Sequence, residues 1–355
     1  MKICILGDTH FGMRGDSILF HEYYKKFYET VFFPYLIENN IKVIFQLGDM
    51  FDRRKFINFN SLYMSRKYFF DRCRDERIQL HTLLGNHDVS FKNTLEVNSS
   101  ELLLKEYDNV VVYRNFSKVT FDDSIDIIPW ICDENQEEIM KQISESKSQI
   151  CFGHFEIAGF EMDRGNICHE GIQEDLLKRY DVVLTGHFHH KSTKGNITYV
   201  GTPGEMTWAD YQDERGFHIF DTSNRELTFI KNPYTMFNKI TYDDTQQDFE
   251  FYKKFDYEKF KNTYVKIVVV KKTNAFLFDS VVDNFIKSGA ADVSIVEEFS
   301  DISITEDEEL VNQAEDTMTI LSKYIDGLQT NVETDKLKTL LRELYVESLN
   351  VETSE

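Results

Sequence analysis

The sequence predicts a mixed α/β fold with two β-sheets, and two observations support this. Over roughly the first hundred residues, short apolar segments alternate with longer amphipathic ones, and an alternation of strands and helices is typical of sheets with parallel strands. After about residue 108 the apolar segments become shorter and more strand-like. We therefore expect mixed α/β layers that contain two sheets.

The expected elements follow from this pattern in chain order. Strands are expected first at residues 3–6, 42–47 and 79–84, with helices at residues 18–39 and 59–77. Pro34 lies inside the first helix and is expected to kink or end it, because proline removes a backbone donor. The later strands are expected at residues 110–113, 124–128, 149–152, 181–184, 197–200 and 216–220.

The pattern changes near residue 235, after Asn232-Pro233-Tyr234. A strand at residues 264–270, a helix at 276–287 and a strand at 292–298 predict a small β-α-β module. An acidic segment at residues 306–309 comes next. Apolar residues at helical spacing then predict two amphipathic helices, with the stripes Met318, Leu321, Ile325 and Leu328, and Leu337, Leu340, Leu341 and Leu344.

Composition narrows the class of protein. A chain of 355 residues predicts about two domains. The sequence contains no apolar run of about 18 residues, so we expect no membrane span. The five cysteines are widely spaced without a CxxC pair, which argues against disulfides and zinc ribbons. We expect a cytoplasmic protein. The net charge of −21 argues by itself against DNA binding. Residues 301–355 hold 14 acids and 4 bases, however, so close to half of the excess negative charge lies in this segment.

Polar clusters follow five of the expected strands. Each cluster combines glycine with aspartate, asparagine or histidine at the carboxyl end of a strand, which is where open α/β sheets place their sites. One such cluster alone is usually an ordinary turn, but five in this order predict a metal site. The clusters are Gly7-Asp8-Thr9-His10, Gly48-Asp49-Met50-Phe51-Asp52, Gly85-Asn86-His87-Asp88, Gly153-His154 and Gly186-His187-Phe188-His189-His190.

The spacing within the clusters is suited to metal coordination. Asp8 and His10 are two residues apart, so in an extended chain their side chains face the same way. The same holds for His187 and His189, while the side chain of His190 should face the other side. A carboxylate such as that of Asp49 can bridge two cations. Mixed imidazole, carboxylate and amide ligands suit manganese, iron or zinc better than calcium.

This series of clusters resembles the calcineurin-like metallophosphoesterase superfamily. Over nearly the whole chain the sequence is similar to the SbcD-type recombination nucleases, above all those of tailed phages. The narrower resemblance rests on motifs beyond the metal clusters. These are Phe51-Asp52-Arg53-Arg54-Lys55, Asn86-His87-Asp88 with Lys92-Asn93, Ile128-Pro129-Trp130, and Gly201-Thr202-Pro203 with Arg215-Gly216-Phe217.

The resemblance implies a fold and a division into domains. The fold would be a four-layer sandwich, in which two mixed β-sheets are flanked by helices, with a small β-α-β capping domain and a C-terminal helical tail. Residues 1–235 would form the nuclease domain and residues 236–300 the DNA-capping domain. Residues 301–316 would be an acidic linker, and residues 317–355 a helical segment that binds a partner ATPase.

The resemblance also implies a role for each site residue. One cation would be held by Asp8, His10 and His189, a second by Asn86, His154 and His187, and Asp49 would bridge the two. His87 matches the family's catalytic histidine, which contacts the scissile phosphate rather than a metal. Asp52 matches the acidic residue that orients this histidine, and Asp88 is the alternative.

The implied activity is nuclease action on DNA with two divalent cations, expected to be Mn²⁺, with Mg²⁺ or another divalent ion as the alternative. Such ions make hydroxide available near neutral pH and neutralise charge on the phosphate, and His87 can protonate the leaving 3′ oxygen. The implied substrates are double-stranded ends and hairpins, in double-strand break repair and recombination. The implied partner is an SbcC-type coiled-coil ATPase, bound by a homodimer of this chain as a heterotetramer. A phage-encoded protein would act in the host cytoplasm.

Residues for DNA and protein binding are less clearly marked. Arg53, Arg54 and Lys55 follow the second cluster and are expected to hold the DNA backbone, although they also fit an ordinary solvated helix start. Lys92 and Arg14 are weaker candidates of the same kind. The stripe at residues 59–70 and the helix near residues 102–104 fit a dimer face or core packing. Leu337, Leu340, Leu341 and Leu344 are expected to dock on the ATPase by a helix-in-groove contact, or to fold back on the chain's own core.

Two other functions remain open from the sequence. A phosphatase, nucleotidase or small-ester phosphodiesterase would use the same metal ligands, but the extra module and helical tail favour the nuclease. A non-catalytic scaffold for the ATPase would not need seven intact ligands together with His87.

Overall fold

The computed structural model describes residues 1–163 and 166–297. Residues Met1–Glu297 form one compact unit. The expected acidic linker at 301–316 and the helical segment at 317–355, with Leu337, Leu340, Leu341 and Leu344, lie outside the described residues. In the described part, no helix combines the length and the apolar character that crossing a membrane requires.

The first sheet carries the amino-terminal strands. Four of its strands are parallel neighbours, and β15 and β16 extend it in antiparallel fashion beside β1. The order across the sheet is β16 (Glu226–Lys231), β15 (Gly216–Asp221), β1 (Lys2–Leu6), β2 (Val43–Gln46), β3 (Gln79–Leu83) and β6 (Val110–Tyr113). Because β1, β2, β3 and β6 run the same way, their carboxyl ends meet at one edge of the sheet.

The second sheet is built in the same manner. Its four central strands are parallel, and an antiparallel strand lies at each edge. The order is β13 (Ser192–Lys194), β14 (Ile197–Tyr199), β12 (Val182–Gly186), β9 (Ile150–His154), β8 (Ser124–Ile128) and β7 (Ser117–Thr120). Two hairpins lie outside the sheets, β4 (Val89–Phe91) with β5 (Thr94–Asn98) and β10 (Glu161–Asp163) with β11 (Asn166–Ile167).

Alternating side chains divide the core into three apolar layers. Ile3 and Ile5 of β1 face the second sheet and pack with Phe152 and Leu184. Cys4 and its neighbours on the opposite face of the first sheet pack against the helices instead, as expected for a strand with a period of two. A third cluster lies on the outer face of the second sheet, beneath α7 (Gln136–Glu145). The chain is therefore a four-layer sandwich, as expected.

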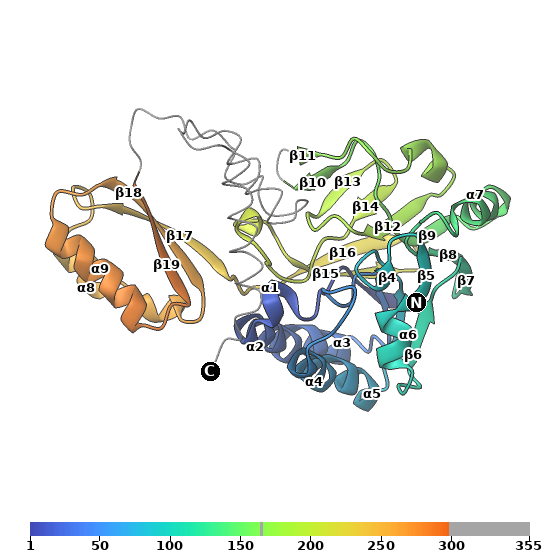
Figure 1. The fold of residues 1–355 in the computed structure, drawn as a ribbon, viewed down its shortest axis with the longest axis horizontal. Coiled ribbons are helices and arrows are strands. Elements are labelled where there is room, and N and C mark those ends of the chain that lie inside the picture. The colour runs from blue at the N-terminus through green and yellow to red at the C-terminus, as the bar shows by residue number, and fades with distance from the viewer. Residues whose placement is uncertain (164–165, 298–355) are drawn as a thin grey trace, which may run out of the picture. The chain divides into compact units, whose positions relative to one another are not determined.

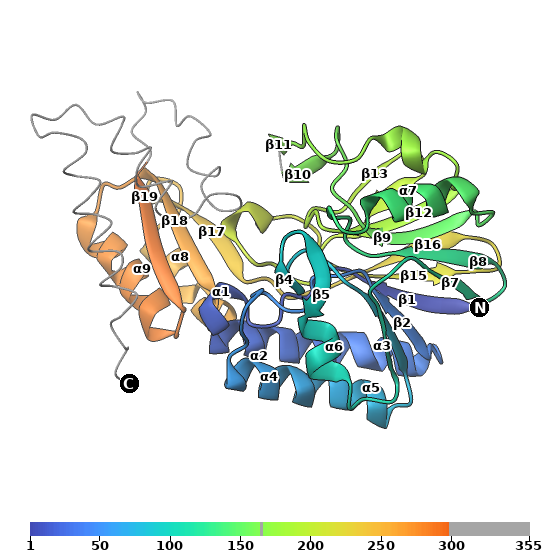
Figure 2. The same cartoon turned by 45° about the vertical axis from the view of Figure 1, so that its right-hand side comes forward.

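Helices cover the outer face of the first sheet. Figures 1 and 2 both show α2 to α5 together on that side, with α7 beyond the second sheet. The helices are α1 (Met13–Asp16), α2 (Ile18–Phe27), α3 (Phe33–Glu38), α4 (Phe59–Ser65), α5 (Asp71–Asp75) and α6 (Ser99–Leu104). All five cysteines are free and buried.

The two long expected helices are each interrupted by a wider turn. A π-helical segment, Tyr28–Phe32, joins α2 to α3, and Pro34 lies in the first turn of α3. A second π-helical segment, Arg66–Phe70, joins α4 to α5. Pro34 thus does not end the helix, because the backbone stays helical from Tyr28 through α3 and the wider turn directly precedes the proline.

A small module follows the sandwich, in orange in Figure 1. Its sheet has the order β17 (Phe237–Asp243), β18 (Tyr264–Lys271) and β19 (Asp292–Glu297), and all three strands are parallel. Two helices belong to it, α8 (Phe249–Lys254) and α9 (Ala275–Lys287). The expected β-α-β unit is present, and β17 with α8 precedes it.

Buried Glu205 ties the sandwich to the start of β17. One oxygen of its carboxylate accepts hydrogen bonds from the backbone N–H groups of Met236 at 2.6 Å and Phe237 at 2.9 Å. Burial raises the pKa of Glu205 to about 7, and the two N–H donors only partly oppose this shift. The folded protein therefore holds a proton on Glu205 at pH values where the unfolded chain has released it.

This tie predicts a pH dependence of stability. Glu205→Gln keeps an acceptor oxygen but removes the titration. The pKa of Glu205 is higher in the folded protein than in the unfolded chain. The free energy of unfolding is therefore greatest below the unfolded pKa, and it falls as the pH rises toward the folded value near 7. Between pH 5 and pH 8, urea unfolding should show the wild type losing on the order of 2 kcal/mol relative to Glu205→Gln. Parallel pH profiles of the two proteins would contradict this account.

Candidate metal centre

Loops from both sheets meet at one place. Asp8 and His10 follow β1, Asp49 follows β2, and Asn86 follows β3. His154 is the last residue of β9 in the second sheet, and His187 and His189 come directly after β12. The centre thus lies where the carboxyl ends of parallel strands of both sheets come together, as the clusters in the sequence indicate.

One group of donors consists of Asp8, His10 and His189. Their ligand atoms lie within 4.8 Å of one another. His10 Nε2 lies 3.1 Å from His189 Nε2, and Asp8 Oδ2 lies 3.8 Å from the same His189 atom. Two imidazole nitrogens that face each other beside a carboxylate are arranged to share a cation.

A second group contains Asp49, His154 and His187, again with ligand atoms within 4.8 Å. The Asn86 amide joins this group, since Asn86 Oδ1 lies 3.0 Å from His154 Nε2 and 2.9 Å from His187 Nδ1. Asp49 lies between the two groups. Its Oδ2 is 3.4 Å from His154 Nε2 and 3.7 Å from His10 Nε2.

Hydrogen bonds fix which ring nitrogen of His154 faces the group. His154 Nδ1 donates to the main-chain carbonyl of Leu47 at 2.7 Å, which directs Nε2 toward Asp49 and Asn86. Such an outer partner sets the tautomer of a metal-binding histidine. The imidazole, carboxylate and amide donors of both groups fit a divalent transition-metal cation.

Burial and mutual charge control protonation at the centre. Burial lowers the pKa of His187 to about 3, and it also lowers the pKa of His189, so both rings are neutral electron-pair donors at pH 7. Burial alone would raise the pKa of Asp49, but His154, His87 and His10 outweigh it and hold this pKa well below its usual range. Burial raises the pKa of Asp8 to about 7, against the opposing effect of His154. A bound cation would favour the charged carboxylates.

His87 stands beside both donor groups. The group of His10, Asp49 and His87 is within the same 4.8 Å limit, and His87 N–H donates to Asp49 Oδ1 at 2.7 Å. Its ring Nδ1 lies 2.6 Å from the main-chain carbonyl of Asp52. Asp52 therefore contacts the His87 ring through its main-chain carbonyl and not, as expected, through its carboxylate. The carboxylate lies 3.3 Å from His10 Nδ1 instead.

Asp88, the alternative candidate for orienting His87, has a different role. Its Oδ1 accepts from Met50 N–H at 3.0 Å, and its Oδ2 accepts from Gly85 N–H at 2.9 Å. The carboxylate thus braces the loop after β2 against the loop after β3. Burial and the nearby Asp49 raise the pKa of Asp88 to about 6. Among the described contacts, its carboxylate holds backbone groups and Ser99, not the His87 ring.

Several donors sit on strained backbone. His10, Asp49 and His187 have φ values of 42°, 52° and 90°, in the left-handed region that costs non-glycine residues of order 1–3 kcal/mol. The loops are also too close for a side chain at Gly85, where a Cβ would lie 2.2 Å from Asp49 Oδ1. The backbone is not extended through His10 as expected, because His10 lies in the left-handed region, but the side chains of Asp8 and His10 still reach the same donor group.

The expected DNA-binding residues lie at different distances from the centre. Arg54 contacts a residue of the donor groups, since its Nη2 lies 3.3 Å from the amide atom of Asn86 that points away from His154 and His187. Arg53 pairs with Asp16 at 3.3 Å and lies over the ring of Phe56. Lys55, Lys92 and Arg14 are exposed. His190 faces away from the donors, as expected, and its Nδ1 lies 2.8 Å from Asp213 Oδ2.

Comparison with known proteins identifies the family. The model of the calcineurin-like phosphoesterases matches residues 1–191. Exonuclease subunit 1 of Enterobacteria phage T4 is 34% identical over 352 residues, which is 98% of this chain and 99% of that protein. This chain belongs to the calcineurin-like phosphoesterase family. The D component of the SbcCD nuclease of Staphylococcus saprophyticus is 25% identical over 263 residues, 64% of this chain and 67% of that protein.

Solved structures resemble the chain more distantly. One reported as an archaeal phosphodiesterase has a TM-score of 0.33 and 16% sequence identity, covering 65% of this chain and all of that one.

Two residues that pack against the metal ligands, Arg215 and Trp130, could not be identified from the spacing of the clusters. Arg215 is buried, and its guanidinium donates to the His189 carbonyl, to Thr202 Oγ1 and to Asp210 Oδ1. Trp130 lies in the loop after β8, with its ring centroid 5.1 Å from that of His187. The sequence marked both residues only as parts of motifs, because their contacts depend on the folded loops.

The shared position of Asp49 predicts how mutations change metal content. Asp49→Asn should lower the content of divalent cations by half or more, because it removes charge from both donor groups. His87→Gln should keep the wild-type content, because His87 lies outside the two donor groups and its Nδ1 lies 2.6 Å from the Asp52 carbonyl. Elemental analysis after loading and gel filtration measures both, with His190→Ala as the control. Full cation content in Asp49→Asn would contradict a shared ligand.

Proposed function

We propose that this chain is the nuclease subunit of an SbcCD-type complex, hydrolysing DNA phosphodiester bonds with two Mn²⁺ ions in break repair and recombination. The observation that supports this most is the complete set of seven donors, with Asp49 between the two groups and His87 beside them. The named activities of the phage and staphylococcal relatives supply the substrate class.

The ligand sets follow the two donor groups. Asp8, His10 and His189 would hold one ion, and Asn86, His154 and His187 the other, with Asp49 as the bridge. When bound, these ions supply Lewis-acid polarisation of the phosphate and a low pKa for water. The protein's own contribution is to fix the donors through contacts such as that of His154 with the Leu47 carbonyl.

His87 is placed for proton transfer. Because its Nδ1 donates to the Asp52 carbonyl, Nε2 is the atom that can reach a substrate. In the proposed reaction a water oxygen attacks phosphorus and the bond from phosphorus to the 3′ oxygen breaks. His87 acts with protons on both ring nitrogens and gives its Nε2 proton to the 3′ oxygen, and the proton that the attacking water releases restores the ring through solvent. The products carry a 5′ phosphate and a 3′ hydroxyl group. Asp52 positions the ring through its main chain.

Other proposed contacts extend this assignment. Arg54 would bind the phosphate backbone beside Asn86, and Arg53, Lys55 and Lys92 would bind it further out. Residues 1–235 would act as the nuclease domain and 236–300 as the DNA-capping domain. Residues 317–355 would bind the coiled-coil ATPase through Leu337, Leu340, Leu341 and Leu344, after the linker at 301–316.

The nuclease proposal predicts Mn²⁺-dependent cleavage of linear and hairpin duplex DNA by the purified chain. His87→Ala should lower kcat by about 10²–10⁴-fold, the usual contribution of general acid–base catalysis. Electrophoresis of end-labelled DNA gives the rate, and His190→Ala, outside the donor groups, is the control. Should the chain turn over a small phosphodiester yet leave DNA intact, even with its ATPase and ATP, the nuclease assignment is wrong.

We also propose that the chain forms a homodimer through an exposed apolar patch that includes Phe59 and Tyr63 of α4. Other aromatic residues of the expected stripe are buried in the core, namely Tyr68, Phe69 and Phe70. Phe59 is 89% exposed, and Tyr63, four residues later on the same helix face, is 58% exposed. Ile18 at the start of α2 and Phe56 before α4 are 65% and 61% exposed. Exposed apolar groups of this kind are typical of protein interfaces.

The dimer proposal predicts that Phe59→Glu halves the mass in solution. A charge in a buried interface is unfavourable, so the variant should be a monomer in light scattering at concentrations where the wild type is a dimer. Phe276→Glu is a matched control, because Phe276 is 78% exposed on α9, outside the patch. A wild-type monomer at high concentration, or an unchanged Phe59→Glu dimer, would exclude this interface.

A further inference from the structure

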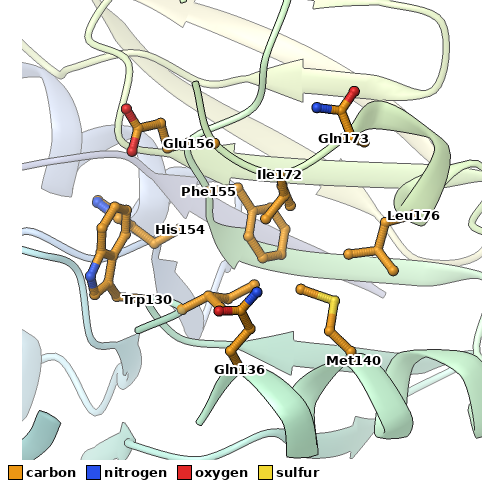
Figure 3. Close-up of a pocket in the computed structure, with 11 residues that line it drawn as sticks. Trp130, Gln136, Met140, His154, Phe155, Glu156, Ile172, Gln173 and Leu176 are labelled. Carbon is orange, nitrogen blue, oxygen red and sulfur yellow. The ribbon is translucent and has the colours of Figure 1, made fainter. Parts of the chain in front are cut away.

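A pocket opens directly beside the metal centre. Its volume is about 490 Å³, within the range that small-molecule sites occupy. Figure 3 shows Trp130 and His154 at one end and Leu176 at the other, with Phe155 and Ile172 between them. His154 therefore belongs both to the donor groups and to the wall of this pocket.

The walls of the pocket are fixed by main-chain contacts. Trp130 N–H donates to the Leu84 carbonyl at 2.7 Å, and the Trp130 carbonyl accepts from Asn135 Nδ2 at 3.0 Å. On the opposite side, Ile172 N–H donates to the Glu156 carbonyl at 2.9 Å. Gly171 makes this approach possible, since its φ is 92° and a Cβ would lie 2.3 Å from the Glu156 oxygen.

The chemistry of the lining favours a largely apolar ligand without negative charge. Apolar side chains such as Phe155, Ile172 and Met140 form most of it. Apart from the centre's own His154, Glu156 is the one ionisable side chain among the lining residues, all of which are described. A carboxylate repels a phosphate group, but it accepts hydrogen bonds from an amino group. The amide of Gln136 offers both a donor and an acceptor.

We propose that this pocket takes one nucleobase of the DNA strand, unstacked from its neighbours, while the phosphate next to it lies at the metal centre. This inference rests on the proposed nuclease function. A base has the apolar faces that the lining accepts and fits within the pocket volume with room to spare, and the shared His154 places the pocket next to the centre. The exocyclic amino group of adenine, cytosine or guanine would donate to Glu156, which thymine cannot do.

The substrate side of this proposal is tested by removing the base. Oligonucleotides with one abasic residue, placed in turn on each side of the scissile phosphate, are compared with the intact strand. At one of the two positions the full-length wild type should cleave the abasic strand about tenfold more slowly, which corresponds to 1.4 kcal/mol, within the usual range for stacking of a single base. Fluorescence anisotropy in EDTA should show the same preference in binding.

The protein side is tested by filling the pocket. Met140→Trp places a larger side chain in it, at a residue that is only partly buried. This variant should cleave intact DNA about as slowly as the wild type cleaves abasic DNA, and it should no longer distinguish the two. Gln142→Trp, on α7 but outside the lining, is the matched control and should behave as wild type. Hydrolysis of a small phosphodiester without a base should be equal in all three.

The outcomes separate this inference from the function on which it rests. If the wild type cleaves intact and abasic strands equally, or if Met140→Trp still distinguishes them, the base pocket is wrong and the nuclease assignment stands. If no DNA is cleaved while the small ester is hydrolysed, the nuclease assignment fails and this inference with it. Loss of small-ester hydrolysis in Met140→Trp would show that the substitution acts on the metal centre instead, and would overturn the proposal.

Discussion

The apolar layer between the two sheets is the constraint on which the rest of the structure depends. Ile3 and Ile5 from one sheet and Phe152 and Leu184 from the other pack face to face, and close packing leaves little freedom in the spacing of the sheets. That spacing fixes the distance between loops that are far apart in the chain. The donors after β1, β2 and β3 can therefore meet those after β9 and β12. A change in this layer would alter the metal centre without touching any ligand.

Much of this arrangement could be predicted from the sequence because it depends on local patterns. Short apolar segments between longer amphipathic ones identified the strands, and the polar residues that follow them share one edge for a topological reason. The resemblance to a known family added the pairing of the two sheets. The backbone at His10 and Asp49 could not be predicted in this way, since the left-handed φ values are imposed by the loops that surround them. The same holds for β17, which depends on its parallel pairing with β18.

The supports of the centre were harder to find in the sequence than the ligands. Asp88, next to His87, resembles a catalytic partner in the sequence, yet its carboxylate holds the backbone of two loops together. Arg215 reaches the His189 carbonyl only because the loop after β12 folds toward the start of β15. Such contacts join residues that are distant in the chain, and no spacing rule records them. Outer partners of this kind matter because ligand geometry depends on them.

The double position of His154 links two equilibria. It faces Asp49 in the centre and also belongs to the pocket wall, so a ligand in the pocket and a cation in the centre would lie against the same residue. If the pocket ligand changes the affinity for the cation by some factor, the cation must change the affinity for the ligand by the same factor. A substitution at His154 would therefore be expected to change the affinity for the cation and the affinity for the substrate together.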